Sequence, residues 1–155
     1  ATGHIAIKDV ATSLTSLAIK KKLELMSESL SVDFGCASPK IAVLGLNPHA
    51  GDNGLMGEEE KTIISPAVRD AKASGVNAFG PYAADGFFGS GAYKDFDGVL
   101  AMYHDQGLAP FKALSFFYAF KKSIFEKYCI LGILVFFNAK SPMLLFRPLP
   151  KGIFK

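Results

Sequence analysis

The chain has 155 residues, of which 50% are hydrophobic and 20% are charged, and its formal net charge is +3. This length and hydrophobic content can fill one core, which excludes a disordered chain and predicts one domain or a piece of a larger one. The basic character is confined to residues 116–155, which contain 7 basic residues and 1 acidic residue, whereas residues 1–115 contain 10 and 13. Because the basic residues of this tail are scattered among Phe, Ile and Leu without a binding motif, we expect no nucleic-acid partner.

The start of the sequence and its two cysteines indicate a compartment. Residues 1–4 show neither a charged start nor an apolar core, so we expect no signal peptide and a cytoplasmic location. Cys36 and Cys129 have no metal-binding or redox spacing, which favours two reduced thiols over a disulfide. The apolar run at residues 128–137 is shorter than the ~20 residues that cross a bilayer, so we expect no membrane anchor.

The first 46 residues predict a helix followed by a strand. Residues 3–7, which include His4, are expected to be extended. A helix over residues 8–30 should follow, because apolar side chains recur there at intervals of three and four. The apolar positions of this helix form two successive series, first Val10, Leu14 and Leu17, then Ile19, Leu23, Met26 and Leu30. Residues 40–46 form a continuous apolar run, typical of a strand buried on both faces of a parallel sheet.

A glycine-rich loop follows this strand and contains His49. Pro48 cannot donate to a sheet ladder, and the glycines at 45, 51, 54 and 57 allow tight turns, so the chain should leave the sheet here. His49 would then lie at the carboxyl end of a strand, where open α/β sheets bind ligands. The alternative interpretation is a turn histidine that simply faces water.

The second half of residues 1–115 predicts another helix and two more strands. Residues 58–73 should be helical, with three glutamates complementing the helix dipole and a kink at Pro66. A strand over residues 75–79 should end at Gly80 and Pro81, before a loop or single helical turn at residues 84–88. A strand over residues 96–103 then delivers His104 and Asp105 at its carboxyl end.

All three histidines therefore lie at junctions between elements, and Asp105 is adjacent to the last one. Three imidazoles that met at one sheet edge could bind zinc or another divalent ion and leave positions open for substrate oxygens. Their long separations in the sequence do not establish that they meet. A shared site of His4, His49 and His104 and three unrelated histidines both remain open from the residues alone.

Four segments resemble one enzyme family, the 4-hydroxythreonine-4-phosphate dehydrogenases of vitamin B6 biosynthesis. They are Gly-His-Ile at residues 3–5 with Lys-Asp-Val at 8–10, Gly-Leu-Asn-Pro-His-Ala-Gly at 45–51, Gly-Pro-Tyr-Ala-Ala-Asp at 80–85, and Met-Tyr-His-Asp-Gln-Gly-Leu at 102–108. These ordered words are more specific than a short glycine pattern. The resemblance covers residues 1–116 and implies an α/β fold, part of an α/β/α sandwich of the isocitrate and isopropylmalate dehydrogenase type.

The resemblance also implies an activity and a set of site residues. His4, His49 and His104 match metal ligands that meet at a dimer interface, Asp85 and Asp105 match catalytic carboxylates, and Lys112 matches a substrate-binding lysine. The implied reaction oxidises 4-phosphooxy-L-threonine to a β-keto acid that decarboxylates to 3-amino-2-oxopropyl phosphate. It uses NAD or NADP and a divalent metal (Zn, Mg, Mn or Co) in a homodimer.

Residues 117–155 depart from the family pattern and are predicted to form a separate, divergent tail. They lack the glycine-rich region and the later Asn and Arg that the family uses to hold substrate. Residues 116–155 contain 8 of the 14 phenylalanines, which favours a frameshifted or foreign origin. Three hypotheses follow: a fragment of the dehydrogenase with impaired activity, a related metal-dependent dehydrogenase of another phosphorylated hydroxy acid, and a non-catalytic remnant.

Overall fold

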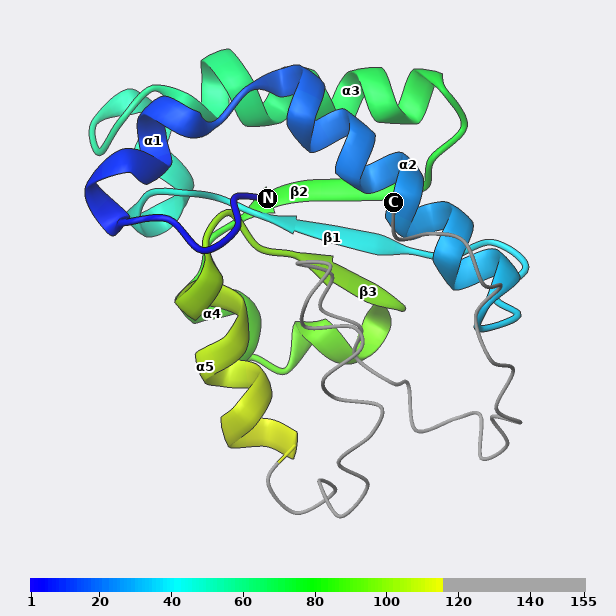
Figure 1. The fold of residues 1–155 in the computed structure, drawn as a ribbon. Coiled ribbons are helices and arrows are strands. Elements are labelled where there is room, and N and C mark those ends of the chain that lie inside the picture. The colour runs from blue at the N-terminus through cyan, green and yellow to red at the C-terminus, as the bar shows by residue number, and fades with distance from the viewer. Residues whose placement is uncertain (116–155) are drawn as a thin grey trace.

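The computed structural model describes residues 1–115, which form a mixed α/β fold around a three-stranded parallel sheet (Figure 1). The central strand is β1 (Ile41–Leu44), with β2 (Ala78–Tyr82) on one side and β3 (Gly98–Leu100) on the other. Ile41 pairs with Ala78 in β2 and with Gly98 in β3. Because both pairings are parallel, all three strands end at the same edge of the sheet. The expected parallel sheet is thus confirmed.

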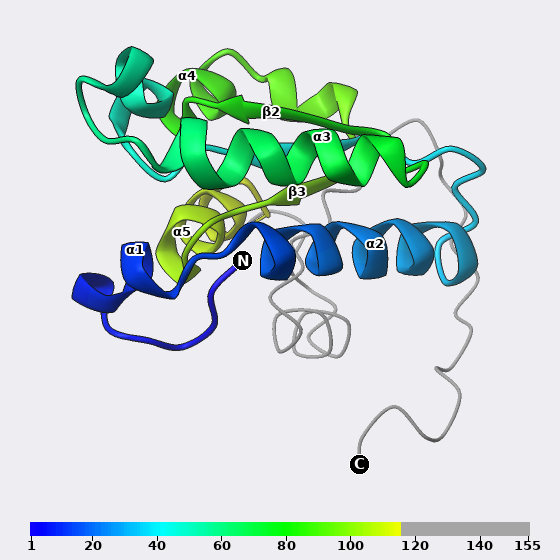
Figure 2. The same cartoon turned by 90° about the horizontal axis from the view of Figure 1, so that it is seen from above.

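Helices cover both faces of this sheet (Figure 1). The α1 (Val10–Ser13), α2 (Ser16–Val32) and α3 (Ser65–Ala73) helices lie on one face, and Figure 2 shows α2 and α3 side by side above the strands. The α4 (Ala84–Gly89) and α5 (His104–Ser115) helices lie on the other face. Short helical turns connect these elements: η1 (Ile7–Asp9), η2 (Pro48–Gly54), the π-helical η3 (Glu60–Ile64) and η4 (Ala92–Asp95).

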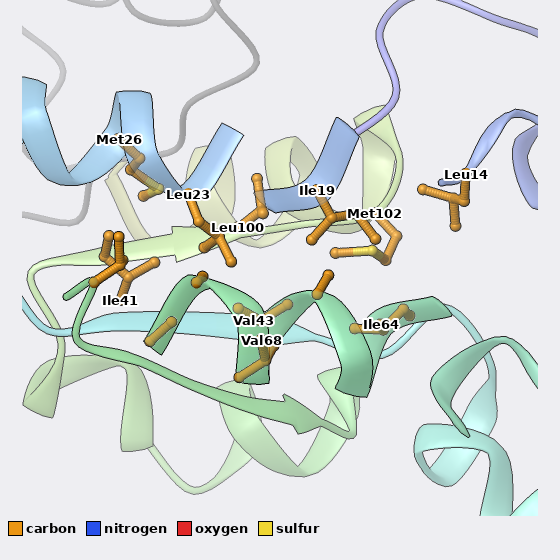
Figure 3. Packing of buried hydrophobic residues seen from close by; sticks show 14 of the residues in the cluster. Leu14, Ile19, Leu23, Met26, Ile41, Val43, Ile64, Val68, Leu100 and Met102 are labelled. Carbon is orange, nitrogen blue, oxygen red and sulfur yellow. The ribbon is translucent and has the colours of Figure 1, made fainter. Parts of the chain in front are cut away.

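The core lies between the sheet and the α2 and α3 helices (Figure 3). Successive side chains of a strand point to opposite faces, so Ile41 and Val43 enter this core while Ala42 and Leu44 face the other layer. All four residues of β1 are fully buried, as the apolar run predicted. Side chains with no exposed surface fill the space between the layers: Ile19, Leu23 and Met26 from α2, Ile64 from η3 and Ala67 from α3.

The expected single helix over residues 8–30 is wrong, because the chain interrupts it before α2. Leu14 and Thr15 have extended backbones, and the Thr15 hydroxyl caps the new helix by accepting a hydrogen bond from the backbone N–H of Ala18 at 3.2 Å. The restart changes which residues face inward. Leu17 was expected on the apolar face but is 77% exposed, since it lies two residues before buried Ile19 and so on another side of the helix.

The second strand was also misplaced in the sequence. It spans Ala78–Tyr82 rather than residues 75–79, and it continues through the Gly80–Pro81 pair that was expected to end it. Pro81 is tolerated because β2 pairs with β1 on one side alone within residues 1–115. Gly80 has a φ of 132°, and a side chain there would collide with the carbonyl oxygen of Val43 where the register shifts.

Three further segments were expected from the sequence. The extended segment expected at residues 3–7 pairs with no strand in the described part of the chain and leads into η1 at Ile7. The strand expected at 96–103 is limited to Gly98–Leu100, and residues 84–88 do form a helical turn. The helix expected at 58–73 forms as η3 and α3, which meet beside Pro66.

Cys36 is a free thiol whose pKa is raised, first by burial and second by the Asp97 carboxylate. Within residues 1–115 no helix is long and apolar enough to cross a membrane, and the tail expected at 117–155 lies outside the described residues.

Candidate functional site

The site residues expected from the sequence follow the carboxyl ends of the three strands. His49 lies in η2 after β1, Asp85 lies in the first turn of α4 after β2, and His104 begins α5 after β3. Since the strands are parallel neighbours, these three segments leave the sheet at the same edge. The sheet topology therefore brings one histidine or carboxylate from each strand end to a common side of the molecule (Figure 1).

His4 reaches this edge because the amino-terminal segment is tied to the end of β3. The backbone N–H and the hydroxyl of Thr2 both donate to the carbonyl oxygen of Met102, at 3.0 and 2.8 Å. The rings of His4 and His104 consequently lie 4.8 Å apart, measured between centroids, at an angle of 52°. Two histidines separated by 100 residues in the sequence are thus in direct contact.

An open pocket of about 290 Å³ surrounds these two rings. Its polar side is formed by His4, His104 and Asp105, and its apolar side by aliphatic residues of the amino-terminal segment and α1. The lining residues are Gly3, His4, Ile5, Ile7, Val10, Tyr103, His104 and Asp105. The pocket therefore offers two imidazoles to a ligand that enters from solvent.

The carboxylate of Asp105 fixes the His104 ring. His104 Nδ1 and Asp105 Oδ1 are 2.6 Å apart, and the side chains are 41% and 76% exposed. When Nδ1 carries the proton and donates to this carboxylate, the Nε2 lone pair is free to bind a ligand, an arrangement that metal-binding histidines commonly show. The donor chemistry of His4 and His104 thus fits a divalent ion of the zinc type.

His49 does not join this pair within one chain. Residues 1–115 contain no group of three or more His, Cys, Asp or Glu side chains placed to hold a metal ion. The His49 side chain is exposed, and its backbone is left-handed, with φ of 54°. The same conformation continues through Ala50, Gly51, Asp52 and Asn53. The structure brings together two of the three expected ligands and leaves the third exposed on a left-handed loop.

Asp85 and Lys112 are both exposed. Asp85 lies in the first turn of α4, and Lys112 lies in the last turn of α5. At 1.5 Å per residue, Lys112 is about 12 Å along the α5 axis from His104. The Lys112 ammonium can therefore contact an anionic group that lies at a distance from the His4 and His104 rings.

Two side chains that hydrogen-bond to the backbone at this edge, Glu60 and Gln106, were not predicted from the sequence. The Glu60 carboxylate, 4% exposed, accepts the backbone N–H of Leu46 at 2.8 Å, and the Gln106 amide donates to the carbonyl oxygen of Gly45 at 2.6 Å. A signal existed for Glu60, because it shares the spacing of the buried residues Ile64, Ala67 and Ala71. Gln106 is the single glutamine of the chain. It was not predicted as a site residue, because the neighbouring His104 and Asp105 were the candidates in this segment.

Comparison with known proteins gives one consistent family. The family model described as "Pyridoxal phosphate biosynthetic protein PdxA" matches residues 1–124. The chain is 57% identical over 114 residues to the 4-hydroxythreonine-4-phosphate dehydrogenase of Bacteroides thetaiotaomicron, covering 74% of this chain and 31% of the relative. It is 53% identical over 116 residues to the same-named protein of Prosthecochloris aestuarii, covering 75% and 34%. The chain thus spans about a third of the length of these relatives.

Solved structures agree with this result. The fold matches a crystal structure of 4-hydroxythreonine-4-phosphate dehydrogenase from Klebsiella pneumoniae with a TM-score of 0.69 and 40% identity, covering 74% of this chain and 35% of that one. A terephthalate 1,2-cis-dihydrodiol dehydrogenase from Burkholderia xenovorans matches with a TM-score of 0.64 and 32% identity, covering 71% and 34%. The same arrangement of elements is therefore found in proteins named for two different dehydrogenase reactions.

Proposed function

The chain belongs to the PdxA family of pyridoxal phosphate biosynthetic proteins, and from this we propose that it carries the metal-binding part of a 4-hydroxythreonine-4-phosphate dehydrogenase. The proposed reaction is the NAD(P)-linked oxidation of 4-phosphooxy-L-threonine to a β-keto acid, which loses its carboxyl group to give 3-amino-2-oxopropyl phosphate. The observation that carries the proposal is the contact between His4 and His104 at the edge where β1, β2 and β3 all end.

The finer structural features belong to the same proposal. We assign the α/β layers to the isocitrate and isopropylmalate dehydrogenase type, in a cytoplasmic homodimer. A dimer accounts for the position of His49, because its exposed loop can complete a site with His4 and His104 of a partner. Support comes from the exposure of all three side chains and from the match to structures of the family.

Each site residue has a proposed task that follows from its position. His4, His49 and His104 bind the divalent ion (Zn, Mg, Mn or Co), and Asp105 orients the His104 ring. When bound, the divalent ion supplies Lewis-acid chemistry at the substrate hydroxyl, and NAD or NADP accepts the hydride. Asp85, exposed at the start of α4, accepts the hydroxyl proton, and the Lys112 ammonium binds the substrate phosphate.

Metal analysis of a His49→Ala variant tests the shared site. We expect the variant to lose most of the divalent metal bound by the purified chain, because one imidazole of three is a large share of the coordination. Its circular dichroism should stay unchanged. Asn53→Ala is the control, since Asn53 lies in the same left-handed loop, with φ of 56°, and carries no proposed ligand. Equal metal content in His49→Ala and the unmodified chain would contradict the shared site.

A second candidate function is oxidation of a different hydroxylated substrate. The observation that favours it is the match to a structure named as a terephthalate dihydrodiol dehydrogenase, at 32% identity. The substrate separates the two candidates, because the first carries a phosphate, for which Lys112 is the proposed partner, whereas a dihydrodiol of terephthalate carries carboxylates and no phosphate. With the missing part of the enzyme supplied, Lys112→Ala should raise the KM for 4-phosphooxy-L-threonine if the first candidate is correct.

A further inference from the structure

A single peptide group at the end of β1 is held by two side chains from distant segments. It joins Gly45 to Leu46. Its carbonyl oxygen accepts a hydrogen bond from Gln106 Nε2 at 2.6 Å, and its N–H donates to Glu60 Oε1 at 2.8 Å. Because a peptide group is planar and rigid, contacts at both of its ends fix its position and its tilt. The chain that leads to His49 therefore departs from the sheet in a defined direction.

Each of these two side chains makes further contacts on its own side. Gln106 Oε1 accepts the backbone N–H of Met102 at 2.7 Å, which ties Gln106 to the end of β3. Glu60 accepts the backbone N–H of Asn47 at 2.7 Å and the Asn47 side-chain amide at 3.0 Å. The peptide group is thus connected to β3 and α5 on one side and to η3 on the other.

Glycines make room for the Glu60 carboxylate. A Cβ at Gly51 would lie 2.6 Å from Glu60 Oε2, and one at Gly45 would lie 3.1 Å from Glu60 Oε1. Glu60 itself is 4% exposed, and burial of a carboxylate is unfavourable unless hydrogen bonds satisfy it. Within residues 1–115 no buried side-chain nitrogen or oxygen lacks a hydrogen-bond partner. The loop is built closely around this carboxylate.

The loop that these contacts hold has an unfavourable backbone conformation. Residues 49–53 are all left-handed, and four of them are not glycine. L-amino acids disfavour this conformation, so a run of this length persists only when its surroundings hold it in place. The contacts of Glu60 lie immediately before this run, at Leu46 and Asn47.

We propose that Glu60 and Gln106 are positioning residues that clamp the peptide group between Gly45 and Leu46 and thereby set the placement of His49 relative to His104. This inference rests on the proposed function, in which both histidines are metal ligands. Gln106 lies two residues after His104 in α5, and Glu60 binds the chain two and three residues before His49. The clamp therefore joins the two histidine-bearing segments through one peptide group.

Two variants that conserve side-chain size test the clamp, Glu60→Gln and Gln106→Met. The first removes the negative charge and places an NH₂ donor against the Asn47 side-chain amide, where Glu60 Oε2 accepts, and the second removes both hydrogen bonds of Gln106. Glu58→Gln is the matched control, since Glu58 is two residues away, 61% exposed and paired with Lys61. The probe is Co²⁺, whose binding is followed by visible absorption, and hydrogen exchange of the Leu46 and Asn47 amides is measured in parallel.

We expect both variants to lower Co²⁺ affinity by about 10- to 100-fold, the range found when groups that orient metal ligands are changed. The double variant should lose less than the product of the single losses, because both side chains act on the same peptide group. The control should match the unmodified chain. If the amides of Leu46 and Asn47 exchange faster in the variants but Co²⁺ affinity is unchanged, the contacts are only structural and the inference is overturned.

A separate readout distinguishes this inference from the proposed metal site. If the unmodified chain binds no Co²⁺, the metal proposal fails, and the imidazole proton resonances of His49 and His104 then decide the clamp. Shifts of both residues in the two variants but not in the control support it, and unchanged resonances overturn it. If Glu60→Gln does not fold, Gln106→Met and Asn47→Ala carry the same test, since the latter removes the Asn47 side-chain contacts with Glu60 and Glu59.

Discussion

At the scale of single residues, the loop after β1 is the most unusual feature of the chain. The left-handed conformation costs an L-residue roughly 1–2 kcal/mol, and His49, Ala50, Asp52 and Asn53 all adopt it. Asn, Asp and His adopt this region more readily than other residues that carry a Cβ, whereas Ala50 has no such preference. Backbone strain of this kind is commonly retained where it places a functional side chain. The loop thus supports a role for His49 beyond that of a turn residue.

Gly51 should be difficult to replace, because the atom that an added Cβ would meet belongs to the buried Glu60 carboxylate. Gly51→Ala introduces a Cβ 2.6 Å from Glu60 Oε2 at a φ of 84°, so both strain and crowding oppose it. Gly75→Ala is a matched control, because Gly75 has a φ of 89° with nothing within 4 Å of the added Cβ. We expect urea unfolding to show a loss of about 1 kcal/mol for Gly75→Ala and about 2–4 kcal/mol for Gly51→Ala. Equal losses would mean that the carboxylate does not crowd this position.

The histidine positions could be predicted from the sequence, but the residues that hold them could not be assigned. His49 and His104 follow apolar runs that form parallel strands, so their common edge was a direct consequence of the pattern. Glu60 was interpreted as one of three acidic residues complementing a helix dipole. Its burial depends on donors at Leu46 and Asn47 that come from another element, and no local pattern reports such contacts.

At the scale of elements, α2 shows how a short break between two helices changes which residues face the core. Leu17 continues the apolar spacing of Val10 and Leu14, which favoured one helix with all three residues inside. The Thr15 cap begins a new helix, whose buried face is defined by Ile19 and Leu23. Periodicity identified helical structure in this region, but it did not show the interruption at Leu14 and Thr15 that sets which face of α2 is buried. A capping residue inside an apolar pattern therefore has to be weighed before a face is assigned.

Two leucines of α2 provide the corresponding stability prediction. Leu23→Ala removes a side chain with no exposed surface, so we expect it to lower the free energy of unfolding by about 2–5 kcal/mol. Leu17→Ala, at a position that is 77% exposed, should change it by less than about 0.5 kcal/mol. Thermal or urea unfolding of the two variants measures the difference. A comparable loss at both positions would show that Leu17 is covered in solution.

The strands show the same limit of local patterns. β1 was predicted correctly because a strand that is buried on both faces has a continuous apolar sequence. β2 lies three residues closer to the carboxyl terminus than predicted. The Gly80 and Pro81 pair is a common signal for a turn, yet here it lies inside an edge strand beside a register shift. Proline can occupy such a position when its missing N–H faces away from the neighbouring strand, which depends on the order of strands in the sheet.

At the scale of the whole molecule, the described residues supply the edge proposed to bind metal but only part of the relatives' length. The chain covers 31% and 34% of two relatives, so about two thirds of their length has no counterpart here. Hydride transfer requires near-attack geometry, and a misplacement of ~1 Å can cost ~100-fold in rate. In the proposed site a single exposed lysine, Lys112, would hold the substrate phosphate, and one such contact orients it only loosely.

We therefore expect the 155-residue chain alone to form little or no NADH from 4-phosphooxy-L-threonine. Replacing residues 117–155 with a family-like continuation and supplying the part of the relatives' length that this chain does not cover should restore turnover. The absorbance of NADH measures both reactions under identical conditions, and the unmodified chain with added metal is the control. Robust NADH production by that control would show that the additional contacts are not required.

The peptide group between Gly45 and Leu46 also has a consequence for the order of folding. Its hydrogen-bond partners are separated from it along the chain by 14 residues for Glu60 and 61 for Gln106, and the N–H of Gly45 additionally donates to Tyr82 at 2.8 Å. The Gln106 contact requires closure of a 61-residue segment, so we expect it to form after the local helices. Interactions absent from the transition state act mainly on the unfolding rate. If the clamp forms after the transition state, it should lower the unfolding rate of the protein and leave the folding rate almost unchanged.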